Sequence, residues 1–177
     1  MKASSSIYLI SILTLSLLFT FNNLSNADLI NDVCKKTDYP DVCISILRSD
    51  PTSANADVQE LIILILKAST SYASKTLIKI NDLMKETTNG YKKLLYMGCT
   101  HGYKVAIADI ALVVDKLRSK SYDYAKIEID SFRQEAEDCE DNFSAPPGPI
   151  YQSNLTDRNL MMMHFADICT KIIVLYF

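Results

Sequence analysis

The chain has 177 residues, hydrophobic residues over 49% of its length and a formal net charge of −3 at pH 7. This length is enough for a single domain with its own core. A mildly acidic chain without a long basic stripe lacks the electrostatic footprint of a nucleic-acid-binding protein, so we expect no nucleic-acid partner. The charge is better suited to a basic protein partner.

Residues 1–27 have the pattern of a secretory signal peptide. Lys2 supplies a positive charge, residues 7–21 form an uncharged apolar run, and Ser25-Asn26-Ala27 offers the small residues of a cleavage site. The apolar run is short for a membrane-spanning helix. We therefore expect a secreted, extracellular protein whose mature chain is residues 28–177. That chain shows no second long apolar stretch, so we expect no membrane association after cleavage.

Two short helices are predicted at the start of the mature chain, over 28–36 and 41–48. The turn between them contains Pro40, which suits the first position of a helix. Cys34 and Cys43 lie on either side of this turn, so we expect a disulfide between them that stabilises the fold by about 2.5 kcal/mol. Helices of this length are marginal in isolation, which gives the bond a clear structural purpose.

A long helix is predicted next, capped at its start by Ser53 or Asn55 and ended by Asn89-Gly90. Within it, residues 61–66 are apolar on every face of the helix. We expect the N-terminal hairpin to cover the apolar side of this run that lies outside the inward stripe. The alternative is an exposed apolar patch that binds a partner.

The following two helices form a hairpin that turns at Ser119-Lys120-Ser121, whose last residue is expected to cap the second helix. The inward residues recur in steps of three and four, first at Cys99, Tyr103, Ala106, Ile110, Val113 and Leu117, then at Tyr122, Ala125, Ile129, Phe132, Ala136 and Cys139. Cys99 and Cys139 each lie roughly 30 Å from the turn. In an antiparallel pair they face each other, so we expect a disulfide that stabilises the fold by about 4 kcal/mol. Gly98 and Gly102 beside Cys99 indicate a close approach of the two helices.

The last helix is predicted to start near Ser153 or Thr156, after a proline-rich loop at 145–149 that excludes a helix. Its inward stripe contains Leu155, Met162, Ala166, Cys169, Ile173 and Tyr176. The five cysteines leave one unpaired in an oxidising secretory route. We identify it as Cys169, a buried free thiol.

All the predicted elements are helices with one apolar stripe, and no strand pattern competes with them. The connections are short, so neighbouring helices run antiparallel. We therefore predict an all-α fold, an up-down-up-down four-helix bundle with an N-terminal helical hairpin and two disulfides.

No catalytic or cofactor site is predicted. His101 and His164 are the only histidines, and neither has a positioned acid or nucleophile near it in the sequence. We expect His101 to be solvated. The cysteine spacings contain no Cys-x-x-Cys pair and the histidines lie far apart, so we expect no metal site.

A cluster of acidic residues ends the helix that contains Cys139. It consists of Glu135, Glu137, Asp138, Glu140 and Asp141. Negative charge near a helix C-terminus opposes the helix dipole, so these residues do not stabilise the helix. We interpret the cluster as a solvated charged face, with binding of a cation or of a basic partner as the alternative.

Two sequons for N-glycosylation lie in the predicted extracellular chain, at Asn142-Phe143-Ser144 and Asn154-Leu155-Thr156. Asn154 lies beside the proline-rich loop and is the better candidate. Asn142 lies close to the predicted bond at Cys139, where a glycan has less room.

Three cysteine-containing segments together match a known pattern. The first contains Cys34, Thr37, Tyr39-Pro40, Cys43, Leu47 and Asp50-Pro51, the second is Cys99-x-x-x-Tyr103, and the third is Cys139-Glu140-Asp141-x-Phe143. Over essentially the whole mature chain they resemble the plant invertase and pectin methylesterase inhibitor family. Within that family the chain is most similar to pollen-allergen-like invertase inhibitors.

The resemblance implies an extracellular protein of the cell wall (the apoplast) that is not itself an enzyme. It implies inhibition of a carbohydrate-active enzyme, plant acid invertase or pectin methylesterase, by covering the active-site cleft in a non-covalent complex. Gly90-Tyr91-Lys92-Lys93 occupies the region where some invertase-directed members carry a Pro-Lys-Phe tripeptide. The alternative is a secreted, non-inhibitory bundle that binds a small apolar ligand or another cell-wall protein.

Overall fold

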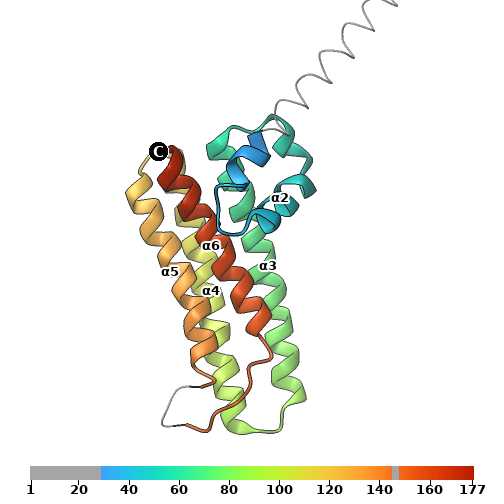
Figure 1. Ribbon diagram of the computed structural model, residues 1–177. Coiled ribbons are helices and arrows are strands. Elements are labelled where there is room, and N and C mark those ends of the chain that lie inside the picture. The colour runs from blue at the N-terminus through green and yellow to red at the C-terminus, as the bar shows by residue number, and fades with distance from the viewer. Residues whose placement is uncertain (1–28, 145–147) are drawn as a thin grey trace, which may run out of the picture.

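The computed structural model describes residues 29–144 and 148–177, so the predicted signal peptide at 1–27 lies outside the described residues. Four long helices stand side by side (Figure 1). They are α3 (Val58–Glu86), α4 (Gly90–Arg118), α5 (Tyr122–Asp141) and α6 (Thr156–Tyr176). α4 packs between α3 and α5, and α6 packs between α5 and α3, which closes the bundle. The predicted all-α, up-down-up-down four-helix bundle is confirmed.

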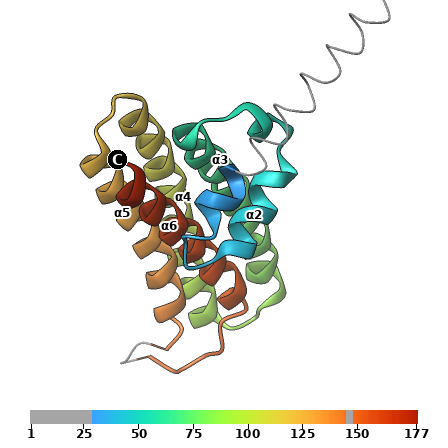
Figure 2. The same cartoon turned by 45° about the horizontal axis from the view of Figure 1, so that its top comes forward.

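The N-terminal hairpin consists of a short helix at residues 29–34 and α2 (Pro40–Ser49), and it packs beside the start of α3 (Figures 1 and 2). A disulfide joins Cys34 to Cys43, with Cα atoms 5.5 Å apart. In the apolar run of α3, the fully buried residues are Leu61, Ile62, Ile65 and Leu66. Leu64 lies with Ile46 of α2 along a shallow hollow. The hairpin therefore covers the additional apolar side of α3, as expected.

The start of α3 differs from the predicted start. Neither Ser53 nor Asn55 caps it, because both lie in a short 3-10 helix, η1 (Pro51–Asn55). The cap is Asp57, whose Oδ1 accepts the backbone N–H of Glu60 at 2.8 Å. Glu60 Oε2 in turn accepts the backbone N–H of Asp57 at 3.0 Å. This reciprocal capping box satisfies two backbone donors, which a single serine or asparagine cap does not.

The connection between α3 and α4 also differs from the prediction. α3 already ends at Glu86, and Asn89-Gly90 begins α4 instead of ending α3. The Oδ1 atom of Asn89 accepts the backbone N–H of Lys92 at 3.0 Å. Asparagine is among the strongest N-cap residues. Gly90 does not use a positive φ angle, so it does not act as a left-handed helix end.

α4 and α5 make the most extensive contact between any two helices. The turn at 119–121 reverses the chain through Lys120, which has a left-handed φ of 57°. Ser121 occupies the N-cap position of α5 as predicted, but its side chain makes no capping hydrogen bond. At the far end a disulfide joins Cys99 to Cys139, with Cα atoms 4.8 Å apart. Both bonds join the pairs of cysteines expected from the sequence.

Close approach of the two helices depends on one of the two glycines beside Cys99. A Cβ atom on Gly102 would lie 2.8 Å from Glu135 Oε2 and 3.2 Å from the Glu135 carbonyl oxygen. Only glycine leaves room for the α5 backbone at this point. Gly98 is exposed and a Cβ atom there would meet nothing within 4 Å. The expectation that Gly98 serves close packing is therefore wrong.

A buried polar network beside the second disulfide joins α4, α5 and α6. Glu140 accepts hydrogen bonds from Thr156 Oγ1 and from Asn159 Nδ2, both at 2.6 Å. The Tyr103 hydroxyl donates to Asn159 Oδ1 at 2.8 Å, and burial raises the pKa of Tyr103. Asn159 is fully buried. The acidic cluster is therefore not simply a solvated face, because Glu140 is a partner within the bundle while Asp141 remains exposed.

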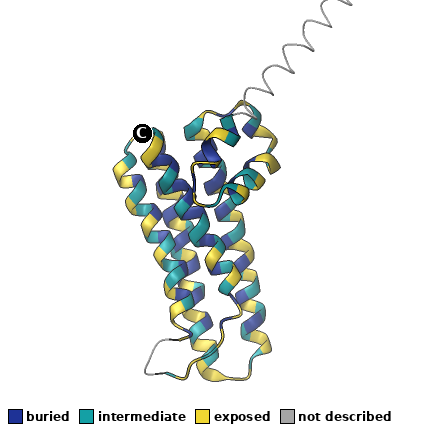
Figure 3. Ribbon diagram, viewed as in Figure 1, coloured by how far each residue is buried: buried dark blue, intermediate teal, exposed yellow. Residues whose placement is uncertain are grey.

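Three helices are more apolar than the sequence pattern suggested. By length and composition alone, α3, α4 and α6 could each cross a membrane. The statement that no second long apolar stretch exists is therefore wrong. Each of these helices buries one side in the shared core, and the buried positions line the inside of the bundle (Figure 3). The remaining apolar residues are exposed or half-buried on outer faces.

We expect that replacing both Cys99 and Cys139 with serine lowers the free energy of unfolding by about 4 kcal/mol, because a long loop is released in the unfolded chain. The Cys34→Ser, Cys43→Ser double variant should lose less, about 2.5 kcal/mol, because its loop is shorter. Urea unfolding followed by circular dichroism measures both. Equal losses would contradict loop length as the cause.

We expect Glu140→Ala to lower the free energy of unfolding by roughly 1–3 kcal/mol, because it leaves Asn159 and Thr156 donors unpaired inside the bundle. Asp141→Ala is the matched control, since Asp141 is the exposed acidic neighbour. Its change should stay within about 0.5 kcal/mol. Thermal and urea unfolding of both variants measure the difference, and similar effects at the two positions would contradict the network.

Candidate functional site

The two histidines do not form a catalytic arrangement. His101 is exposed on the outer side of α4, as expected. The His164 ring stacks on Tyr39 at 3.8 Å between ring centres, and its Nδ1 atom is buried with no hydrogen-bond partner in the described part of the chain. A general base needs an orienting partner and a reachable proton. His164 therefore packs the N-terminal hairpin onto α6.

The described residues contain no group of three or more His, Cys, Asp or Glu side chains that could hold a metal ion. Among the acidic cluster, Glu137 accepts from Arg133 Nη1 at 2.7 Å. Glu140 is engaged by α6. Glu137 and Glu140 are thus directed to different partners.

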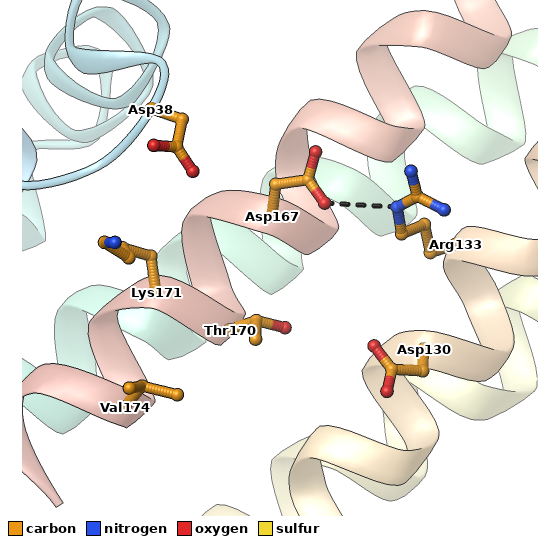
Figure 4. Close-up of a pocket in the computed structure, with 7 residues that line it drawn as sticks. All are labelled: Asp38, Asp130, Arg133, Asp167, Thr170, Lys171 and Val174. Atoms are coloured by element: carbon orange, nitrogen blue, oxygen red, sulfur yellow. Dashed lines mark hydrogen bonds and ion pairs between the residues drawn. The ribbon is translucent and has the colours of Figure 1, made fainter.

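A charged hollow of about 430 Å³ lies between α5, α6 and the turn that contains Asp38 (Figure 4). At its edge Arg133 Nε donates to Asp167 Oδ1 at 3.1 Å, which ties α5 to α6. Burial lowers the pKa of Arg133, but the carboxylates of Asp167 and Glu137 more than offset this and raise it. The guanidinium therefore stays charged and engaged. Asp38, Asp130, Thr170 and Lys171 also line the hollow, and the ion pair at its edge joins α5 to α6.

The outer side of α4 is unusual in its composition. We call it the α4 outer face, and its residues are Leu94, Met97, Gly98, His101, Lys104, Ala108, Ala111 and Leu112, all exposed. Leu94 is 62% exposed, Met97 57% and Leu112 44%. These residues recur every three or four positions, so they form one strip about 27 Å long. Most exposed positions of α5 are instead polar or acidic, at Asp123, Asp130, Gln134, Asp138 and Asp141.

This strip bears few charges for an exposed helix face. Lys104 is its one lysine, and the described residues offer it no ion pair. In the most apolar 18-residue segment of α4, only 33% of the residues are buried in the bundle. Contiguous exposed apolar surface of this kind marks a site for another molecule. The α4 outer face is therefore the candidate functional site.

Comparison with known proteins identifies the family. The sequence model described as "Plant invertase/pectin methylesterase inhibitor" matches residues 28–172. The chain belongs to the plant invertase/pectin methylesterase inhibitor family. This is a family of inhibitors of enzymes, and its members are not enzymes themselves.

Two similar relatives carry inhibitor names. A pectinesterase inhibitor from Actinidia deliciosa is 29% identical over 147 residues, covering 83% of this chain and 77% of the relative. A cell wall / vacuolar inhibitor of fructosidase from Arabidopsis thaliana is 27% identical over 175 residues, covering 97% of each. The crystal structure of a mutant form of a pectin methylesterase inhibitor from Arabidopsis superposes with a TM-score of 0.65 at 22% identity, over 80% of this chain and 93% of that chain.

The site residues predicted from the sequence are the five cysteines, Asn142 and Asn154. None of them lies on the α4 outer face. Four of the cysteines pair within the fold. Asn142 and Asn154 are exposed, and their glycosylation stays a prediction. The inward-facing stripes on which the sequence predictions rest do not include the α4 outer face. A second apolar series at the same helical spacing, offset to the outer side of residues 94–112, is the signal that could have found it.

We expect Cys169 to react with thiol reagents only after unfolding. It is the free cysteine of the described chain, is buried, and its pKa is raised by burial, so little thiolate forms. Without reductant, a maleimide reagent should add nothing to the native protein and one label per chain in urea, as measured by intact mass. A label on the native protein, or more than one in urea, would contradict this arrangement.

Proposed function

We propose that this protein is a secreted inhibitor that binds acid invertase or pectin methylesterase through the α4 outer face. The complex is non-covalent, and the bundle covers the active-site cleft of the enzyme. The observation that carries the proposal is an exposed apolar strip on a chain whose family consists of enzyme inhibitors. The extracellular location follows from the predicted signal peptide and is supported by the cell-wall name of one relative.

Rigidity supports this mode of action. A binding surface that is already ordered loses little conformational entropy when the complex forms. The disulfide at Cys99 lies at the level of the strip, and it holds α4 against α5. The strip therefore meets the enzyme in its folded shape, and small residues such as Gly98 and Ala108 permit close approach of the partner surface.

The composition of the strip suits a protein partner. Fully buried interface centres are depleted in charge and enriched in residues such as methionine. Met97 lies near one end of the strip and Leu112 near the other, with His101 and Lys104 between them. A complex with either enzyme would bury the apolar ends of the strip and leave Lys104 in position to meet acidic groups of the partner.

Titration of the purified protein against plant acid invertase and against pectin methylesterase tests the proposal. We expect stoichiometric loss of activity with one of the two enzymes, because each bound inhibitor blocks one cleft. The enzyme that loses activity identifies the target. Full residual activity of both enzymes, from acidic to neutral pH, would contradict an inhibitory function.

A pair of matched variants tests the surface. Leu112→Asp places a charge on the α4 outer face and should weaken inhibition at least about tenfold, since an unpaired charge is buried in the complex. Leu160→Asp is the control, because Leu160 is 43% exposed against 44% for Leu112 and lies on α6, diagonally opposite α4. It should inhibit as the parent does. Inhibition that survives Leu112→Asp would exclude this face as the contact.

A specific feature favours the alternative function. A hollow of about 420 Å³ between α2, α3 and α6 is lined mainly by apolar side chains, namely Val42, Ile46, Tyr72, Met161 and Phe165, with Asp41 and Ser45 at its edge. This size and lining suit a small apolar ligand. The alternative gains support if the titration shows no inhibition of either enzyme.

A further inference from the structure

A second exposed hollow lies at the end of the bundle where α4 turns into α5. Its volume is about 420 Å³, and its walls come from the turn, the first residues of α5 and the end of α6. Figure 1 shows the end of α6 beside this turn. Its lining includes no residue of the α4 outer face and none of the predicted site residues.

Aromatic rings form one wall of the hollow. Tyr122 and Phe177 stack on each other, with ring centres 4.4 Å apart and planes at 19°. Tyr124 stands separately and is 63% exposed, and Phe177 is 50% exposed. The Tyr122 hydroxyl is held by Gln59 of α3 at 3.3 Å. The hollow thus presents a ring that is positioned by packing and another, Tyr124, that is open to solvent.

Basic residues surround these rings. Lys120 and Lys126 line the hollow, and Lys116 Nζ lies 5.6 Å from the centre of the Tyr124 ring. Lys126 is paired with Asp123 at 2.8 Å. Lys116 and Lys120 have no carboxylate within ion-pair distance among residues 29–144 and 148–177. On a chain of net charge −3, Lys116 over the Tyr124 ring and Lys120 at the hollow form a locally positive site.

The way α4 ends places Lys120 at the hollow. The Lys120 N–H donates to the Leu117 carbonyl oxygen at 2.9 Å, and the Ser121 N–H donates to the Lys116 carbonyl oxygen at 2.8 Å. This pair of bonds ends a helix on a residue in the left-handed conformation. Lys120 is that residue, with a φ of 57°, and it lines the hollow.

From the hollow, the rings and the unpaired lysines together, we infer that this end of the bundle binds a carboxylated oligosaccharide. The apolar face of a sugar ring packs on Tyr124, and carboxylates of neighbouring sugar units pair with Lys116 and Lys120. Stacking and charge pairing act on different parts of a ligand, so rings and ammonium groups together favour a chain of uronate units over a single small anion. This binding would hold the protein on an acidic polysaccharide while the α4 outer face stays open.

The test uses a galacturonate oligomer of defined length and the full mature protein, with binding measured by calorimetry and by NMR shift changes. We expect binding that weakens as sodium chloride rises, because the charge pairs are exposed. Tyr124→Ala should weaken it about tenfold, the effect of losing one packed ring. Lys120→Glu should weaken it at least as much, because it replaces attraction with repulsion.

Tyr91→Ala is the matched control, because Tyr91 is also an exposed tyrosine beside lysines, but at the opposite end of α4 and outside this hollow. It should bind the oligomer as the parent does. Three results would overturn the inference: no binding of the galacturonate oligomer, equal binding of a neutral galactose oligomer, or equal losses in Tyr124→Ala and Tyr91→Ala. Because no enzyme is present, these results are independent of the outcome for inhibition.

Discussion

The bond between Cys99 and Cys139 sets the register of α4 against α5, and the rest of the bundle is built on that pair. It places the next residue, Glu140, where both carboxylate oxygens receive hydrogen bonds from α6. Gly102 removes the side chain that would separate the two helices at the same level. A covalent link, a close backbone approach and a buried polar network therefore act together at one end, and α6 is positioned because α5 is already held.

The apolar residues exposed on α4 are not part of the core, so core packing does not explain them. Leu94, Met97 and Leu112 contribute nothing to the interior, yet they stand in one strip along α4. The neighbouring α5 differs, because its exposed positions are mostly acidic or polar. Because the chain belongs to a family of enzyme inhibitors, we propose the enzyme surface as the partner of this strip.

The parts of the fold that sequence reasoning predicted follow from periodicity and length. Inward stripes recur every three or four residues, and two helices of similar length bring Cys99 and Cys139 to the same height. The helix starts were less predictable. Ser53, Asn55 and Asp57 are all acceptable caps, and the choice of Asp57 depends on whether Glu60 reaches back to complete the capping box. Several side chains within a few residues could accept the free backbone N–H groups at the helix start. Composition alone does not show which of them forms the cap.

The sequence by itself determined the helical class, the inward faces, the cysteine pairs and the family resemblance, because each of these depends on spacing along one chain. Only the tertiary structure decided that Glu140 is an interior partner while Asp141 is solvated, that Gly102 and not Gly98 serves close packing, and that Lys116 lies over Tyr124. These facts depend on which neighbouring helix a side chain faces. The helical periodicity predicts on which face of its own helix a residue lies. It does not predict which residue of a neighbouring helix packs against it.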